Sequence, residues 1–162
     1  LVSLIYTIFP KAKFLYVKRH PIDCILSGFM QDFRMNAAML HFLDIEDIAN
    51  LYIKTQRAWE HQKKMLPLDY HEFHYEDMIA DFDGEVGKML DFIGVGWDDK
   101  VRDFYKNQDG GDGPKTLTPS RTQVSQKLNN KSQDRWKHYR KHLEPAIEIL
   151  APMVKELGYK ID

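Results

Sequence analysis

The stretch that decides the fold is Lys13-Phe14-Leu15-Tyr16-Val17-Lys18-Arg19-His20-Pro21-Ile22-Asp23-Cys24-Ile25-Leu26-Ser27. Residues 13–19 are short, β-branched and aromatic-rich, which is typical of a buried strand of an α/β sheet. Pro21 suits the first turn of a helix, and apolar residues then recur at helical spacing to about Arg34. The stretch therefore predicts a strand, a tight turn and a helix.

The rest of the chain continues this alternation of helix and strand. The pattern predicts helices over 1–9, 44–66, 81–93 and 97–105, and a second strand over 70–75. Two last helices are expected, one capped by Ser132 and one opened by Pro145, while 107–119 is expected to form a loop. Trp59, Trp97 and Trp136 are expected in or near the core. We predict an α/β domain with a parallel sheet flanked by helices.

Composition limits the classes of function. A chain of 162 residues with 43% hydrophobic residues can form one core, and a formal charge of −1 argues against a nucleic-acid binder. The single cysteine, Cys24, allows no intrachain disulfide, and no apolar run is long enough for a membrane span. We expect a soluble, cytoplasmic protein. Because the chain starts at Leu1 inside a helical pattern, we also expect that upstream sequence is missing.

An anion site is predicted where the first strand meets the following helix. Arg19 ends the strand, and the positive end of the helix dipole faces the same point. Ser27 follows Arg19 by eight residues and shares a helix face with Asp23, Gln31 and Arg34. Arg19 and Ser27 can both donate hydrogen bonds to a phosphate. The alternative from local sequence is that Arg19 pairs with Asp23 and that Ser27 faces solvent.

The run from Ala12 to Ser27 resembles the 3′-phosphate-binding segment of sulfotransferases that use 3′-phosphoadenosine-5′-phosphosulfate (PAPS). The likeness is greatest to tyrosylprotein sulfotransferases and to bacterial sulfotransferases attached to helical repeats. It implies that Arg19 and Ser27 bind the 3′-phosphate of the donor. It also implies a sulfotransferase fold of the kind found in P-loop-containing nucleotide hydrolases.

The resemblance extends to the end of the chain. His74 to Ile79 resembles the segment that places a tyrosine, here Tyr75, beside the adenine and the 3′-phosphate. Residues 120–129 resemble a late loop that closes over the nucleotide, and Arg135 occupies the place of a donor-binding lysine. The implied donor-binding residues are Arg19, Ser27, Tyr75, Ser120, Arg121, Gln123, Asn129 and Arg135. Ser120 and Arg135 would stabilise charge on the departing phosphate oxygen, so Ser120 is also a catalytic candidate.

Local sequence offers a plainer role for three of these residues. Ser120 follows Pro119 and suits a turn, Arg135 suits an exposed first helical turn, and Tyr75 suits a half-buried strand. The chain also departs from the family. Gln31 stands where tyrosylprotein members have a second phosphate-binding arginine, which Arg34 would have to replace.

The family's phosphosulfate loop and catalytic base normally precede the region that starts here, so no general base is assigned. We therefore expect residues 1–162 to be the C-terminal part of a single sulfotransferase domain whose N-terminal part is missing, inactive on its own. The parent enzyme would transfer a sulfuryl group from PAPS to a hydroxyl of a protein tyrosine, a sugar or a small alcohol and release adenosine 3′,5′-bisphosphate.

Two other functions remain open from the sequence. One is a P-loop nucleotide or small-molecule kinase, and the other is a non-catalytic module that retains the fold. We expect no metal site, because His71 and His74 should point to opposite faces of a strand and have no cysteine partners. The basic run 137–142 suits a solvated helix face or a contact with an anionic substrate.

Overall fold

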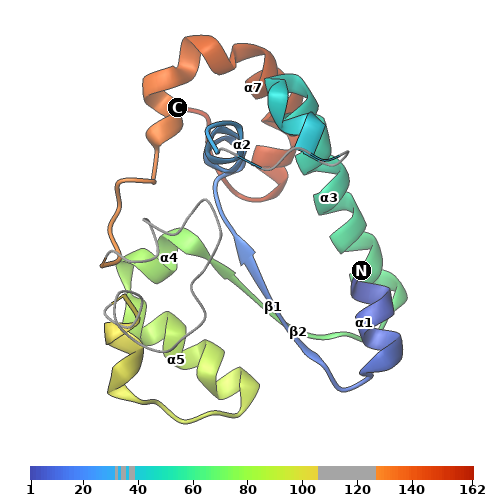
Figure 1. The fold of residues 1–162 in the computed structure, drawn as a ribbon, viewed down its shortest axis with the longest axis vertical. Helices are drawn as coiled ribbons and strands as arrows, with labels where there is room; N and C mark the ends of the chain where they lie inside the picture. Colours follow the sequence, from blue (N-terminus) through green and yellow to red (C-terminus); the bar gives the residue numbers. More distant parts are fainter. Residues whose placement is uncertain (32, 34–35, 37–38, 106–126) are drawn as a thin grey trace.

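The computed structural model describes residues 1–31, 33, 36, 39–105 and 127–162. Figure 1 shows the helices packed around a small sheet. In chain order the elements are α1 (Val2–Ile8), β1 (Lys13–Lys18), α2 (Pro21–Phe29), the 3-10 helix η1 (Met39–Leu43), α3 (Ile45–Met65), β2 (Asp69–His74), α4 (Tyr75–Ala80), α5 (Phe82–Ile93), the 3-10 helices η2 (Asp99–Asp103) and η4 (Arg135–Tyr139), and α7 (Arg140–Glu156).

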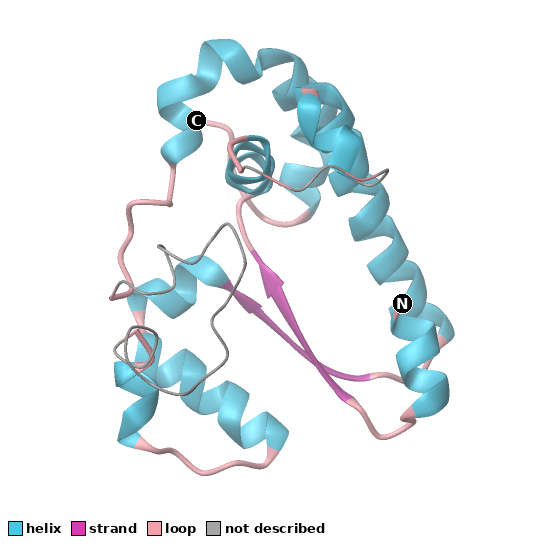
Figure 2. Ribbon diagram, viewed as in Figure 1, coloured by secondary structure: helices cyan, strands magenta, loops and turns pink. Residues whose placement is uncertain are grey.

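The strands β1 and β2 pair in parallel, with a register that runs from Lys13 opposite Asp69 to Lys18 opposite His74. This pairing confirms the predicted parallel α/β sheet. Because parallel strands end at the same edge, the segments that leave β1 and β2 start together. Figure 2 shows the tip of β1 pointing toward α2 and the tip of β2 pointing toward α4. Chemistry carried by residues just after the strands is therefore concentrated at one edge.

Helices cover both faces of the sheet, as predicted. On one face the Tyr16 ring stacks on Trp59 of α3, with ring centroids 4.4 Å apart. On the other face His71 stacks on Phe92 of α5 at 5.6 Å. Leu15 and Val17 of β1 nevertheless keep 45% and 52% of their surface exposed, because α5 packs mainly against β2. The expectation of a fully buried first strand was therefore wrong, and β1 alternates between half-buried and exposed residues.

A half-buried carboxylate connects α3 to the sheet. Glu72 of β2 accepts hydrogen bonds from Lys18 Nζ at 2.5 Å, Lys63 Nζ at 2.7 Å and Trp59 Nε1 at 2.9 Å. Partial burial favours the neutral acid, but these three donors outweigh it and lower the pKa of Glu72 to about 2. Glu72 therefore stays ionised and holds β1, β2 and α3 together.

The hydrophobic core lies among the helices rather than on the sheet. It is built from α2, α3, η4 and α7 and contains Ile22, Ile25, Leu26, Ile48, Ala49, Trp136, Leu143, Ala146, Ile147, Leu150 and Val154. Gly28 allows α2 to approach its neighbours closely, since a Cβ there would lie 2.8 Å from Ile48 Cδ1 and 2.8 Å from the Phe42 ring. The helix that follows Arg19 is thus held rigidly by core packing.

Several local predictions are confirmed. Asp44 caps α3 by accepting from the amides of Glu46 and Asp47, and this 21-residue helix is the longest described. Asp81 caps α5, and Gly94 ends it with a left-handed φ of 82°. Trp59 and Trp136 are buried, at 5% and 0% exposure. Among the helices of the described residues, none is both long and apolar enough to span a bilayer.

Other predicted boundaries were wrong. The helix after Pro21 ends at Phe29 rather than near residue 34, and the helix predicted over 97–105 is reduced to η2. Trp97 consequently lies outside a helix and is 38% exposed, where its Nε1 donates to Asp99. The predicted loop at 107–119 lies outside the described residues.

The last two helices begin at other residues than expected. Ser132 does not cap η4, which has Asp134 at its N-cap in a left-handed conformation with φ 53°. Pro145 does not open α7, which begins at Arg140 and contains both Pro145 and Pro152. Apolar burial explains the longer helix, because Leu143 and Ala146 on either side of Pro145 are both buried in the core.

Candidate functional site

Two of the predicted site residues, Arg19 and Tyr75, meet at the carboxyl edge of the sheet. Each directly follows the last paired residue of its strand, Lys18 in β1 and His74 in β2. The Arg19 guanidinium carbon lies 5.1 Å from the centroid of the Tyr75 ring, which is a cation–π contact. The parallel register therefore places a cation and an aromatic ring together at the point where the sequence predicted an anion site.

Arg19 is also tied to the segment that precedes η4. Its Nη2 donates to the backbone oxygen of Ser132 at 2.6 Å, across 113 residues of sequence. A guanidinium has five N–H donors, and within the described part of the chain the remaining Arg19 donors have no hydrogen-bond acceptor. One side of Arg19 is thus fixed by the protein, and the other retains donors that suit a phosphate.

The first turn of α2 offers fewer backbone N–H donors to an anion than the sequence predicted. Pro21 has no N–H, and the Ile22 amide already donates to His20 Nδ1 at 3.3 Å. The Asp23 carboxylate is 2% exposed and accepts from the amides of Asp134 and Trp136, at 2.8 and 3.0 Å. An anion bound here depends on Arg19 more than on free helix amides.

The prediction that Asp23 lies on an exposed face of the helix was therefore wrong. Its side chain points inward and serves as the cap that η4 lacks, which also explains why Ser132 is not needed for that role. Burial raises the pKa of the Asp23 carboxyl, while the Trp136 amide and the charge of Arg19 oppose the rise. The carboxylate is thus committed to the backbone of η4, with Arg19 as a nearby positive charge.

Ser27 lies on α2 and is half-buried. It follows the first residue of the helix by six positions, so the helical rise places it about 9 Å further along the axis. No hydrogen bond joins its hydroxyl to another of the described residues. Gln31 follows the end of α2, and Arg34, the expected substitute for a second arginine, lies outside the described residues.

The remaining predicted site residues are placed differently from Arg19 and Tyr75. Asn129 is exposed and closes a local turn, with Nδ2 donating to Lys127 O and Oδ1 accepting from Lys131 N, both at 3.1 Å. Arg135 is exposed at the start of η4, three residues after the Ser132 carbonyl that binds Arg19. Ser120, Arg121 and Gln123 lie outside the described residues.

The sequence did not indicate the residues that surround this edge. Glu76 accepts from the His20 amide at 2.9 Å and from the Tyr159 hydroxyl at 2.9 Å. His20 is 7% exposed and stacks on Trp136 at 5.3 Å. A signal for Glu76 was available in its position, because an acidic residue directly after Tyr75 must also lie at the strand edge. Tyr159 had no comparable signal, since only folding brings it near residue 76.

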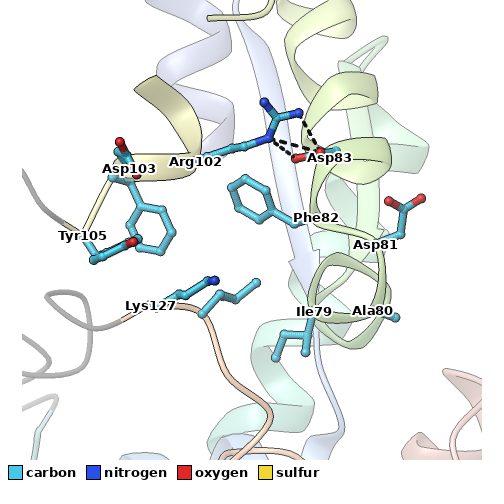
Figure 3. A pocket seen from close by; sticks show the side chains of 11 residues that line it. Ile79, Ala80, Asp81, Phe82, Asp83, Arg102, Asp103, Tyr105 and Lys127 are labelled. Carbon is cyan, nitrogen blue, oxygen red and sulfur yellow. Dashed lines mark hydrogen bonds and ion pairs between the residues drawn. The ribbon is translucent and has the colours of Figure 1, made fainter. Parts of the chain in front are cut away.

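A pocket of about 500 Å³ lies elsewhere, where α4, α5 and η2 meet Lys127 and Leu128 (Figure 3). Its lining does not include Arg19, Ser27, Tyr75 or Arg135. Arg102 and Asp83 pair across one side, with a 2.7 Å contact from Nη2 to Oδ2, and Arg102 also binds Asp99. The pocket is therefore separate from the edge that holds Arg19.

The two strand histidines point to opposite faces, as predicted. His71 stacks on Phe92 of α5, whereas His74 Nδ1 lies 2.8 Å from the Tyr159 hydroxyl. In the described ranges, no group of three or more His, Cys, Asp or Glu side chains is arranged to hold a metal ion. Most of the basic run 137–142 is exposed at the junction of η4 and α7.

Comparison with known proteins agrees with the fold described above. Residues 1–99, which include Arg19, Ser27 and Tyr75, match the sulfotransferase family. The chain belongs to the sulfotransferase family. It is also 29% identical over 157 residues to an uncharacterized protein of Aquifex aeolicus (strain VF5), and this match covers 96% of the chain and 20% of the relative. The chain therefore spans about a fifth of the length of that relative.

Proposed function

We propose that this chain is the donor-binding part of an enzyme that transfers a sulfuryl group from PAPS to an acceptor hydroxyl. The observation that carries the proposal is the contact of the Arg19 guanidinium with the Tyr75 ring at the carboxyl edge of the parallel sheet. Ligands of open α/β sheets bind at this edge. Membership of the sulfotransferase family supports the same class of reaction.

In this proposal Arg19 binds the 3′-phosphate of the nucleotide. Its Nη2 is held by Ser132 O, so the guanidinium is oriented before the ligand arrives, and its other N–H groups donate charge-assisted hydrogen bonds. Ser27 adds a hydroxyl donor from α2. Tyr75 contributes an aromatic surface beside the adenine, and Arg121, Gln123 and Asn129 are proposed as further contacts to the nucleotide.

The reaction breaks one S–O bond and forms another. The acceptor hydroxyl oxygen attacks sulfur, the bond between sulfur and the 5′-phosphate oxygen breaks, and that oxygen keeps the electron pair. Adenosine 3′,5′-bisphosphate leaves, and the hydroxyl proton passes to a base that is not assigned within this chain. Ser120 and Arg135 are proposed to stabilise the charge that develops on the departing oxygen. The acceptor is a protein tyrosine, a sugar or a small alcohol.

The proposal is tested by titrating the intact protein with adenosine 3′,5′-bisphosphate in a calorimeter. Arg19→Ala should weaken binding by about 2 kcal/mol, because a charge-assisted contact to phosphate is lost. Arg57→Ala is a matched control, since Arg57 lies on α3 and forms an exposed bidentate pair with Glu156 at 2.6 and 2.7 Å. It should leave the affinity unchanged.

Two outcomes would contradict the proposal. Arg19→Ala could bind as tightly as the unsubstituted protein, which would remove the phosphate role of Arg19. Alternatively, ATP could raise the melting temperature more than adenosine 3′,5′-bisphosphate does, which would favour a kinase.

A further inference from the structure

Two of the residues proposed to bind the nucleotide, Arg19 and Tyr75, are each followed by a residue that links their strands. His20 follows Arg19, and Glu76 follows Tyr75. The His20 amide donates to Glu76 Oε1 at 2.9 Å, so a single hydrogen bond joins the chain just beyond β1 to the chain just beyond β2. The separation of Arg19 and Tyr75 is therefore set by this connection as well as by the strand register.

Tyr159 completes the connection from the C-terminal segment. Its hydroxyl donates to Glu76 Oε2 at 2.9 Å, and His74 Nδ1 lies 2.8 Å from the same hydroxyl oxygen. Because the hydroxyl proton is directed to the carboxylate, His74 Nδ1 must be the donor in the second contact. Burial, and then the negative charge of Glu76, raise the pKa of Tyr159, so the hydroxyl keeps its proton.

The end of α7 directs Tyr159 to this position. Gly158 has a φ of 82°, its amide donates to Lys155 O at 3.1 Å, and the Tyr159 amide donates to Val154 O at 2.9 Å. These two bonds form a Schellman motif, which turns the chain sharply after the helix. The carbonyl of Lys160, the residue after Tyr159, accepts from His20 Nε2 at 2.9 Å. The turn therefore presents both a hydroxyl and a carbonyl to the strand edge.

We propose that His20, Glu76 and Tyr159 form a clasp that positions Arg19 and Tyr75 for the nucleotide. The inference rests on the proposed function, because it assigns these residues an indirect role in binding adenosine 3′,5′-bisphosphate. The clasp contacts neither phosphate nor base. It holds the backbone from which Arg19 and Tyr75 project, so its loss allows the two side chains to separate.

Tyr159→Phe is the direct test, and Tyr16→Phe is its matched control. Tyr16 is also half-buried and also donates one hydrogen bond, from its hydroxyl to Gln56 Oε1 at 2.8 Å, but it lies in the middle of β1 against α3. Both variants lose one tyrosine hydroxyl, and Tyr159→Phe should lose more stability because it also removes the acceptor of His74 Nδ1. Only Tyr159→Phe should weaken adenosine 3′,5′-bisphosphate binding, by about fivefold, in the intact protein.

A second readout reports on the clasp without the nucleotide. Hydrogen exchange of the peptides that contain residues 19–24 and 74–79 should accelerate in Tyr159→Phe and stay unchanged in Tyr16→Phe. Glu76→Gln serves as a second variant if Tyr159→Phe does not fold. Its NH2 group replaces one of the two carboxylate oxygens and cannot accept from the donor, His20 or Tyr159, that this oxygen bound.

The outcomes separate the clasp from the proposed function. If the unsubstituted protein binds adenosine 3′,5′-bisphosphate and Arg19→Ala weakens it, but Tyr159→Phe behaves like Tyr16→Phe in affinity and exchange, the clasp is refuted and the proposed function stands. If the unsubstituted protein does not bind the nucleotide, the proposed function is refuted together with the positioning role. Unchanged exchange near His20 in both Tyr159→Phe and Glu76→Gln overturns the clasp in either case.

Discussion

The ionised Glu72 should make a large, pH-dependent contribution to stability. Its carboxylate accepts from Lys18, Lys63 and Trp59 between β2, β1 and α3, and its side chain is only 19% exposed. Glu72→Gln keeps the size of the side chain and removes its charge. The substitution leaves two ammonium groups facing a neutral amide, so the sheet and α3 should separate more easily.

The magnitude follows from the lowered pKa. Glutamate ordinarily ionises near 4.5, and in the fold Glu72 does so at about 2. At 1.36 kcal/mol per pKa unit the difference amounts to roughly 3.4 kcal/mol, and residual solvent contact reduces it to about 2 kcal/mol. Because the folded-state pKa is the lower one, this stabilisation is fully present above pH 4.5. It is lost as the pH falls from 4.5 toward about 2.

Urea denaturation of the two proteins at several pH values measures this contribution. At pH 7 Glu72→Gln should lower the free energy of unfolding by about 2 kcal/mol, and at pH 3 more than half of that difference should disappear. Glu156→Gln is the control, because its exposed pair with Arg57 should contribute less than about 1 kcal/mol. A difference between Glu72→Gln and the unsubstituted protein that stays constant from pH 7 to pH 3 would refute the reasoning.

Two further predictions concern the helices around the site. Gly28→Ala should lower stability by about 1 to 2 kcal/mol, because the clash with Ile48 and Phe42 exceeds the gain in helix propensity. Gly87→Ala, in α5 with nothing within 4 Å of the new Cβ, should instead raise it by about 0.5 to 1 kcal/mol, and thermal unfolding compares the two. Asp23→Asn should lower stability by about 1 to 3 kcal/mol, because its NH2 group replaces one carboxylate oxygen and cannot accept from the backbone amide, of Asp134 or of Trp136, that this oxygen bound. A change below about 0.5 kcal/mol would argue against the capping role.

Local sequence was sufficient wherever a structure depends on neighbouring residues. Asp44 caps α3 through amides two and three residues away, and Gly94 ends α5 through its own left-handed conformation. The β-branched and aromatic-rich run of β1 and the alternation in β2 predicted two strands, and their parallel pairing then placed Arg19 and Tyr75 at one edge. The two strands follow from rules that act over a few residues, whereas the pairing that joins them connects residues 56 positions apart.

Long-range contacts explain what the sequence could not reveal. Ser132 suited an N-cap by residue type, but Asp23 caps η4 from 111 residues away. Pro145 suited a helix start, but burial of Leu143 and Ala146 extends α7 past it. Tyr159 joins Glu76 across 83 residues, and no spacing in the sequence encodes that contact. The prediction that Trp97 lies in or near the core was wrong for a related reason. An apolar side chain on a short helix is buried only where another element packs over it.

The role of Arg19 can be tested by changing the residue and the ligand together. Adenosine 3′,5′-bisphosphate and adenosine 5′-phosphate differ only in the 3′-phosphate, so their affinities for the intact protein and for Arg19→Ala form a complete cycle. We predict that the intact protein prefers the 3′-phosphorylated ligand and that Arg19→Ala removes about 2 kcal/mol of this preference, or roughly 30-fold. If Arg19→Ala weakened both ligands equally, Arg19 would not be the residue that binds the 3′-phosphate.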